Sequence, residues 1–164
     1  IAGATEEEIR RGMLSFEGVV RRFDFKLKTD RIVFLSDYAH HPAEIRQSVL
    51  SLREVFDGRK LTAIFQPHLY TRTRDFYKDF ANSLSFDEVI LTEIYPVREQ
   101  PIPGVTSQII FDELRPDMQR RICQKTDVPQ IVENEDFDVL IVLGAGDLDN
   151  YCDEITEILK RKYC

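Results

Sequence analysis

Two apolar periodicities alternate along most of this chain. Short β-like runs fall at residues 61–65, 89–94, 121–125 and 139–143. Segments with apolar residues at helical spacing lie at 42–56, 71–84 and 107–114, and around Tyr151, Ile155 and Ile158 near the end. Strands that are separated by helices pair in parallel. The sequence therefore predicts an α/β fold with a mostly parallel, doubly wound sheet and helices on both of its faces.

The first part of the chain follows a different pattern. Residues 5–16 place three acidic residues behind a threonine and carry apolar residues at helical spacing, which predicts a short capped helix. Two β-like runs follow at residues 20–27 and 32–36. The polar break between them predicts a β-hairpin that precedes the parallel part of the sheet.

Composition limits the class of protein. The chain has 164 residues, 43% of them apolar, which suits one globular domain with a sizeable core. Its net charge of −7 argues against a nucleic-acid partner, whose binding domain would normally carry a positive face. No apolar stretch approaches the roughly 20 residues of a membrane-spanning helix, so no membrane partner is expected. Three widely spaced cysteines indicate neither a disulfide framework nor a zinc cluster, and reduced thiols in a cytoplasm are the simplest interpretation.

Ligands of open α/β sheets bind beyond the carboxyl ends of the parallel strands. That rule selects three loops, at residues 37–42, 66–74 and 144–147. The first two loops contain all the histidines of the protein, which are His40, His41 and His68. A lone histidine is usually structural, but this clustering at the expected ligand edge favours a functional site. Zinc is the obvious rival ligand, although adjacent histidines point in different directions and no HxxxH or HxH spacing is present.

The second of these loops runs into a helix with two arginines in its first turn. Arg72 and Arg74 would lie where free backbone N–H groups and the helix dipole favour anions. A guanidinium there suits bidentate recognition of a carboxylate or phosphate. We assign that role to Arg72, which is close to His68, and expect Arg74 to lie in a solvated helix start, paired with Asp75 or with neighbours of Lys78.

Three further features each have two interpretations. Arg21 and Arg22 lie at the start of the hairpin and either bind phosphates or are an ordinary surface pair. The GAGD segment at residues 144–147 lets a backbone approach a ligand closely, since glycine has no Cβ, but it is only a fragment of a dinucleotide motif. The Pro-flanked loop at residues 95–105 is either a lid or a rigid connector.

Five segments of the chain together resemble the Mur ligases. In the order and at spacings comparable to that family, they are SFEGVVRRFD at 15–24, SDYAHHPAEI at 36–45, FQPHLYTRTRDFYKDFA at 65–81, EIYPVREQPIPGV at 93–105 and VLGAGD at 142–147. The resemblance covers nearly the whole chain, and five motifs in register are highly specific. The HHP and FQPHLYTRT elements favour the member that adds L-alanine, whereas DYAH is shared with ligases that add later amino acids.

The resemblance implies a particular place in a larger enzyme. Mur ligases have an amino-terminal UDP-binding domain, a central P-loop ATPase domain and a Rossmann-like carboxyl-terminal domain. Residues 18–164 resemble the last of these, and residues 1–17 the closing helix of the central domain. The chain begins at Ile1 without a methionine, so we expect it to be a piece of something longer. The family's GTxGKT phosphate loop is absent from this sequence, as are the carboxylates and carbamylated lysine that hold Mg²⁺.

The activity that the resemblance implies is an ATP-dependent, ADP-forming ligation. L-alanine is joined to the lactyl carboxylate of UDP-N-acetylmuramic acid through an acyl phosphate, in peptidoglycan precursor synthesis in the bacterial cytoplasm. This domain would bind the amino acid and close over ATP, with the central and N-terminal domains of its own chain as partners and Mg²⁺ held mainly by the central domain. The fragment alone is therefore expected to be inactive.

The resemblance also assigns roles to single residues. The positions that match amino-acid-binding residues are Tyr38, His40, His68 and Arg72, and those that match nucleotide-binding residues are Arg22 and Asp37. His68 and Arg72 would hold the carboxylate of alanine, and Tyr38 and His40 would lie near its amino group, which must be neutral to attack. Arg22 would reach the ATP phosphates and Asp37 the ribose. No catalytic residue and no metal ligand is expected in this chain. Some relatives carry an arginine where this chain has Leu69, which would leave the carboxylate one charged partner fewer.

Three alternatives stay open. They are a Mur ligase that adds a different amino acid, a free-standing nucleotide-binding module, and a metal-dependent hydrolase built on the histidines. The nucleotide-binding module predicts a glycine-rich loop after the first strand of the α/β part, but DYAHHP contains no glycine. Stoichiometric zinc that is lost in a His40→Ala variant would support the hydrolase.

Overall fold

A computed structural model of the chain describes residues 3–16 and 18–164. Its strands are β1 (Asp24–Lys28), β2 (Val33–Asp37), β3 (Leu61–Phe65), β4 (Glu88–Leu91), β5 (Gln119–Ile122) and β6 (Val139–Leu143). Its helices are α1 (Glu6–Leu14), α2 (Pro42–Val55), α3 (Tyr70–Ser83), α4 (Gln108–Glu113), α5 (Val128–Asn134) and α6 (Cys152–Tyr163), with the 3-10 turns η1 (Lys125–Asp127) and η2 (Leu148–Tyr151). Among the described residues, no helix has both the length and the apolar character that crossing a bilayer requires.

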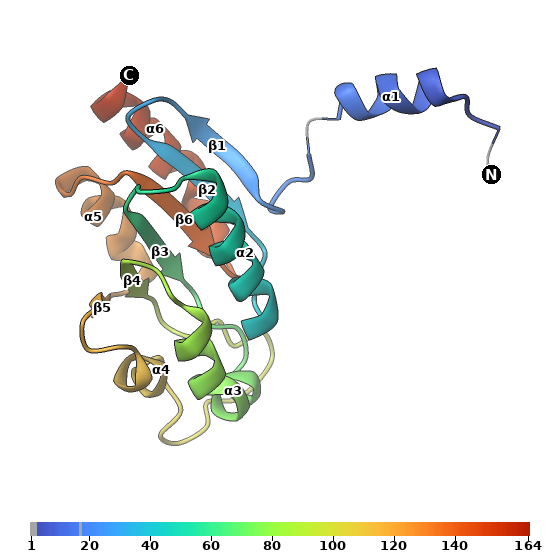
Figure 1. Cartoon of the computed structure of the whole chain (residues 1–164). Helices are drawn as coiled ribbons and strands as arrows, with labels where there is room; N and C mark the ends of the chain where they lie inside the picture. The colour runs from blue at the N-terminus through green and yellow to red at the C-terminus, as the bar shows by residue number, and fades with distance from the viewer. Residues whose placement is uncertain (1–2, 17) are drawn as a thin grey trace.

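The strands form one mixed sheet in the order β1-β2-β6-β3-β4-β5. β1 and β2 pair as an antiparallel hairpin, and every other neighbouring pair is parallel. β6 comes last along the chain but lies in the middle of the sheet, between β2 and β3 (Figure 1). The predicted fold is therefore confirmed: a mostly parallel α/β sheet that is preceded by a hairpin.

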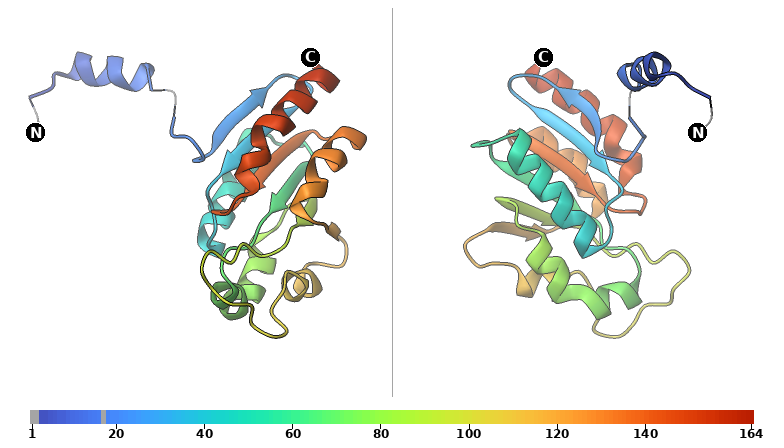
Figure 2. Two further views of the ribbon diagram at one scale, coloured as in Figure 1. Left: turned by 180° about the vertical axis from the view of Figure 1, so that it is seen from behind. Right: turned by 45° about the vertical axis from the view of Figure 1, so that its right-hand side comes forward.

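Helices cover both faces of the sheet, as its doubly wound topology requires. Figure 2 shows α5 and α6 in front of the sheet in its left view, and α2 and α3 in front in its right view. Alternate side chains of β6 pack into the two hydrophobic cores, one on each face of the sheet. Val139, Ile141 and Leu143 pack with α2, α3 and α4, whereas Leu140 and Val142 pack with α5 and α6. All five are buried, which explains why this strand is a continuous apolar run.

Three elements differ from the prediction. β1 begins at Asp24, four residues after the start of the predicted run at 20–27, because the chain turns at Arg21 and Phe23, which have φ +61° and +48°. β5 begins at Gln119, two residues before the predicted strand at 121–125, because it is an edge strand of polar residues and lacks an apolar run to mark its bounds. α5 was not predicted, since its seven residues are too few to show a helical stripe. Pro129 in its first turn is the local signal that would have revealed it.

Helix α1 stands apart from the α/β body in Figure 1 and in the left view of Figure 2. The predicted cap is confirmed: the Thr5 hydroxyl accepts a hydrogen bond from the Glu8 N–H, and the Glu8 carboxylate accepts one from the Thr5 N–H. No residue of α1 is buried, and Ile9 and Met13 are 54% and 74% exposed. An amphipathic helix with its apolar side in water has no tertiary contact to stabilise it, so α1 depends on its cap and on local pairs.

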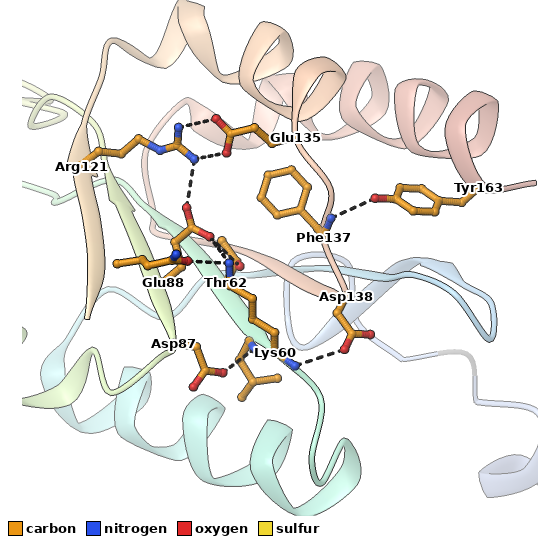
Figure 3. A network of polar contacts seen from close by, with 11 residues as sticks. Lys60, Thr62, Asp87, Glu88, Arg121, Glu135, Phe137, Asp138 and Tyr163 are labelled. Atoms are coloured by element: carbon orange, nitrogen blue, oxygen red, sulfur yellow. Dashed lines mark hydrogen bonds and ion pairs between the residues drawn. The ribbon is translucent and has the colours of Figure 1, made fainter. Parts of the chain in front are cut away.

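Charged side chains tie together the strands at their amino ends (Figure 3). Glu88 on β4 accepts hydrogen bonds from Lys60 at 2.8 Å and from Arg121 at 3.0 Å. Arg121 also pairs with Glu135, and that pairing raises the pKa of its guanidinium. The carboxylate of Asp87 accepts from the Leu61 N–H at 2.7 Å. These charges satisfy one another, which makes this edge a structural network and leaves the opposite edge as the place for a ligand.

Candidate functional site

The three predicted ligand loops follow neighbouring strands. Asp37 at the end of β2 is in register with Leu143 at the end of β6, and Leu143 is in register with Phe65 at the end of β3. Because the three strands are parallel, the loops at 37–42, 66–74 and 144–147 leave the sheet at one edge. The predicted site edge is therefore confirmed as a structural feature.

Aromatic and imidazole rings form a row at this edge. The ring centroids of Tyr38 and His40 are 5.1 Å apart, and those of His40 and His68 are 5.8 Å apart. The Tyr95 ring lies 5.8 Å beyond His68. The first two residues come from the β2–α2 loop and the third from the β3–α3 loop, so the fold brings together histidines that are 28 positions apart in the sequence.

Arg72, in the first turn of α3, lies beside His68 of the loop that precedes this helix. Its Nη1 is 3.2 Å from His68 Nδ1, and both side chains are half-buried. Burial, followed by the positive charge of Arg72, lowers the pKa of His68 below its ordinary value, against a smaller opposing effect of Glu99. His68 is therefore a neutral hydrogen-bonding group at physiological pH, and Arg72 carries the positive charge of the pair.

The chain reaches Arg72 through a strained residue. Leu69 has φ +71°, in the left-handed region that residues with a Cβ rarely adopt. It is the N-cap residue of α3, but its side chain makes no capping hydrogen bond. Its N–H donates to the Tyr95 carbonyl at 2.9 Å. Glu99 supplies the missing cap, accepting from the Thr71 N–H at 3.0 Å and from the Thr71 hydroxyl at 2.5 Å. These bonds tie the 95–99 part of the loop to the start of α3, which favours the rigid-connector interpretation there.

The two arginines of the hairpin have different surroundings. Arg21 donates to the carbonyls of Gly144 and Gly146, both at 3.1 Å, and its Nε is 3.3 Å from Asp149. It therefore joins the hairpin to the GAGD segment. Arg22 is exposed, and its guanidinium lies 5.0 Å from the centre of the Tyr38 ring. Of the pair, Arg22 is the one whose charge is available to a ligand.

The glycines of the GAGD segment are required by packing. A Cβ on Gly146 would lie 2.2 Å from Gln66 Oε1 and 2.8 Å from the Cβ of Tyr95. Gln66 is fully buried and holds the segment, donating to Asp147 at 2.9 Å and accepting from the Leu148 N–H at 3.0 Å. Sequence reasoning missed this role of Gln66, although a polar residue directly after a buried strand was a signal for it.

Asp37 is almost fully buried at the end of β2. Its Oδ2 accepts a hydrogen bond from the Ser48 hydroxyl of α2 at 2.5 Å, and its backbone carbonyl accepts one from the Gly144 N–H at 3.1 Å. These contacts tie α2 and the GAGD segment to the sheet. The contact of Asp37 with a nucleotide ribose stays a prediction.

Two other groups near the site are structural. Arg74 pairs with Asp75 at 2.7 Å on the surface, as predicted. His41 turns toward Phe76, with ring centroids 5.2 Å apart, and its Nδ1 accepts from the Ala43 N–H to cap α2. The argument from clustering therefore applies to His40 and His68 only. Within residues 3–16 and 18–164, no three His, Cys, Asp or Glu groups are arranged to hold a metal ion, which leaves the zinc hydrolase alternative without a set of ligands.

The family model described as "Mur ligase, glutamate ligase domain" matches residues 21–146, well over half of the chain. The chain belongs to the Mur ligase family. This confirms the resemblance that the five motifs indicated.

Individual relatives agree with this result. The Mur ligase chain is 62% identical over 163 residues to the UDP-N-acetylmuramate–L-alanine ligase of Phocaeicola vulgatus, a match that covers 99% of this chain and 36% of the relative. It is 48% identical over 160 residues to the enzyme of the same name from Porphyromonas gingivalis, covering 96% of this chain and 35% of the relative. The chain thus spans about a third of the length of the curated relatives it matches.

Two solved structures show the same fold. The UDP-N-acetylmuramate–alanine ligase of Thermotoga maritima is similar with a TM-score of 0.78 at 26% identity, covering 98% of this chain and 34% of that one. The folylpolyglutamate synthase of the same organism has a TM-score of 0.66 at 20% identity, covering 93% of this chain and 34% of that one. At that identity the second likeness concerns the fold alone.

Proposed function

We propose that residues 18–164 are the carboxyl-terminal domain of an ADP-forming ligase that joins L-alanine to UDP-N-acetylmuramic acid in the bacterial cytoplasm. The observation that carries the proposal is the pairing of Arg72 with a neutral His68 beside His40 at the ligand edge of the sheet. Relatives up to 62% identical that are named UDP-N-acetylmuramate–L-alanine ligase support it.

In the proposed reaction this domain delivers the amino acid. Arg72 and His68 hold the carboxylate of alanine, and Tyr38 and His40 lie near its amino group. Leu69, in place of the arginine of some relatives, leaves Arg72 as the charged partner of that carboxylate. When the domain closes on the rest of the enzyme it shields the activated muramyl carboxyl group from water, which would otherwise hydrolyse it.

Mur ligases use ATP, and we assign two residues of this chain to its nucleotide. Arg22 is exposed and suits the ATP phosphates, and the Asp37 oxygen that is not bonded to Ser48 suits a ribose hydroxyl. ATP supplies the phosphoryl group that activates the carboxylate. We assign the binding of Mg²⁺ mainly to the central domain of the same enzyme, as the resemblance to the Mur ligases implies.

We also propose that residues 1–17 are the closing helix of that central domain. Residues 1, 2 and 17 lie outside the described residues, and the proposal rests on α1. Its exposed apolar side chains, Ile9, Met13 and Leu14, need a surface that the α/β body does not provide. The central domain, as the preceding part of the chain, is the partner that we assign to them.

The experiment that tests the function uses the full-length enzyme. ADP release is followed with ATP, Mg²⁺ and UDP-N-acetylmuramic acid, with L-alanine, glycine or L-serine added. We expect release that requires an amino acid and prefers alanine. The isolated 164-residue chain should release no ADP, since it lacks the phosphate loop. Release that is indifferent to the amino acid would leave only the fold and reopen the nucleotide-binding alternative.

A pair of matched variants tests the site. Arg72→Ala should lower kcat/KM for alanine by about 10²-fold, because a charged hydrogen bond worth roughly 3 kcal/mol is lost. Its melting temperature should barely change, since a half-exposed arginine adds little stability. Arg74→Ala, two positions along the same helix, removes only a surface pair and should leave both quantities unchanged. Normal kinetics with a large loss of stability in Arg72→Ala would show that Arg72 is a structural residue.

A further inference from the structure

The two histidines of the site have different partners at the same ring atom. His40 Nδ1 is 2.9 Å from the carbonyl oxygen of Tyr38. A carbonyl oxygen only accepts hydrogen bonds, so this nitrogen must carry the proton. In a neutral imidazole the other nitrogen then has a free lone pair. The geometry therefore makes Nε2 of His40 an acceptor.

His68 has the opposite arrangement. Its Nδ1 is 3.2 Å from Arg72 Nη1, and a guanidinium only donates hydrogen bonds. The lone pair of His68 must therefore lie on Nδ1 and its proton on Nε2. The lowered pKa of His68 keeps the ring in this neutral form near pH 7. The site thus presents donors on the side of His68 and Arg72, and an acceptor on the side of His40.

A carboxylate stands behind the ring of His40. Glu44 Oε2 is 3.4 Å from His40 Nδ1, and the N–H groups of His40 and His41 hold it at 2.9 Å and 3.1 Å. Partial burial acts to raise the pKa of Glu44, but these hydrogen bonds and the charge of Arg22 outweigh it and hold the pKa below its usual value. A negative charge is thereby fixed on the side of the ring opposite Nε2.

The spacing of donors and acceptor fits an amino acid in its zwitterionic form. The nitrogen and the carboxyl carbon of an α-amino acid are about 2.5 Å apart. The rings of His40 and His68 are 5.8 Å apart, so one amino acid can contact both. Its carboxylate needs donors and therefore faces His68 and Arg72. Its ammonium group needs an acceptor and therefore faces His40.

We propose that His40 accepts a proton from the ammonium group of the incoming amino acid, and that Glu44 positions its ring and stabilises the imidazolium that forms. The inference rests on the proposed function and deepens it by naming the proton acceptor. An N–H bond of the ammonium group breaks, its electron pair remains on nitrogen as the lone pair that attacks, and the proton forms a bond to His40 Nε2. The rings in contact with this imidazole are those of Tyr38 and neutral His68. The positive charges near these groups include Arg22, beside Tyr38 and Glu44, and Arg72, beside His68. Glu44 is the negative charge that offsets the new one.

The first test measures the tautomers directly on the 164-residue chain. Long-range ¹H–¹⁵N NMR spectra, recorded above the range in which histidine gains a proton, report which ring nitrogen carries hydrogen. We expect hydrogen on Nδ1 of His40 and on Nε2 of His68. Finding hydrogen on Nε2 of His40 would overturn the inference, whatever reaction the full enzyme catalyses. This measurement does not depend on the proposed function.

The second test is a pH rescue in the full-length enzyme. His40→Gln should lower kcat/KM for alanine by about 10²-fold or more near neutral pH, the usual contribution of a general base. Above the titration range of alanine's amino group the loss should shrink, because the free amine needs no proton acceptor. Arg72→Ala should show no such recovery, since its carboxylate contact is lost at every pH. A loss in His40→Gln that is the same at both pH values would overturn the role of His40.

Two variants of neighbouring residues complete the design. Glu44→Gln keeps a side chain that can cap α2 but removes the charge, and should lower kcat about 10-fold with little change in the KM for alanine. Unchanged kcat would exclude the positioning role of Glu44. His41→Asn is the control, because asparagine also caps helices and His41 faces Phe76, away from the site. Its pH profile should match that of the unmodified enzyme. Failure of that enzyme to release ADP in response to alanine would overturn the proposed function, while the NMR result would still decide the tautomers.

Discussion

A methyl group at position 146 has no room in this fold, and its effect can be worked out from the structure. The Cβ of Gly146→Ala would lie 2.2 Å from Gln66 Oε1 and 2.8 Å from the Cβ of Tyr95. Ordinary contacts between such atoms are about 3.5 Å, so the Gln66 amide must move by more than about 1 Å. Gln66 is completely buried and has little free space to move into.

The cost has two parts. Moving the Gln66 amide disturbs its hydrogen bonds to Asp147 and from the Leu148 N–H, which together contribute about 2 kcal/mol. Overpacking of a filled interior adds about 1 kcal/mol or more. We therefore expect the free energy of unfolding to fall by about 3 kcal/mol. For a domain of this size that corresponds to a fall of about 6–12 °C in melting temperature.

Urea and thermal unfolding of the 164-residue chain, followed by circular dichroism because it has no tryptophan, measure this loss. Gly12→Ala is the control: its new methyl group enters open space in α1, so the unfolding of the α/β body should not change. In a double-mutant cycle with Gln66→Ala, the double variant should lose less stability than the two single variants together, since the truncated side chain no longer obstructs the methyl group. A Gly146→Ala variant within about 0.5 kcal/mol of the original chain would refute the reasoning.

Two further predictions concern single charged or nucleophilic groups. Burial acts to raise the pKa of Asp87, but hydrogen bonds from Arg53 and from a backbone N–H outweigh it and lower the pKa. Asp87→Asn should therefore be less stable than the original chain at neutral pH, with the difference vanishing as pH falls through that lowered pKa; urea unfolding at several pH values measures this, and a pH-independent difference would contradict it. Burial raises the pKa of Cys123 to about 11 and that of Cys152 to about 12, whereas Cys164 is exposed. Brief treatment with iodoacetamide near pH 7 should alkylate Cys164 first, and equal labelling of the other two in mass spectra would show that they are accessible.

Local patterns predicted the elements well where an element has a strong period of its own. The strand β6 is recognisable as a continuous apolar run because both of its faces are buried. The helix α2 is recognisable by its apolar stripe because one side of it is buried. The edge strand β5 and the seven-residue α5 were predicted poorly or not at all, since one is polar and the other is too short to repeat. Their existence depends on the strands and helices that they pack against.

The sequence by itself determined the class of fold and the edge that carries the site. Strands alternating with helices must run parallel, and parallel strands must end on one side, so the loops with His40 and His68 had to share an edge. Such inferences need only the geometry of single elements.

Only the tertiary structure decided which residues meet across that edge. The place of β6 between β2 and β3 brings Arg21 to the carbonyl of Gly144, 123 positions away, and so separates its role from that of Arg22. The same strand order sets Gly146 against Gln66. Local periodicity contains no information about which strands become neighbours, because that choice depends on how all the helices and strands pack together.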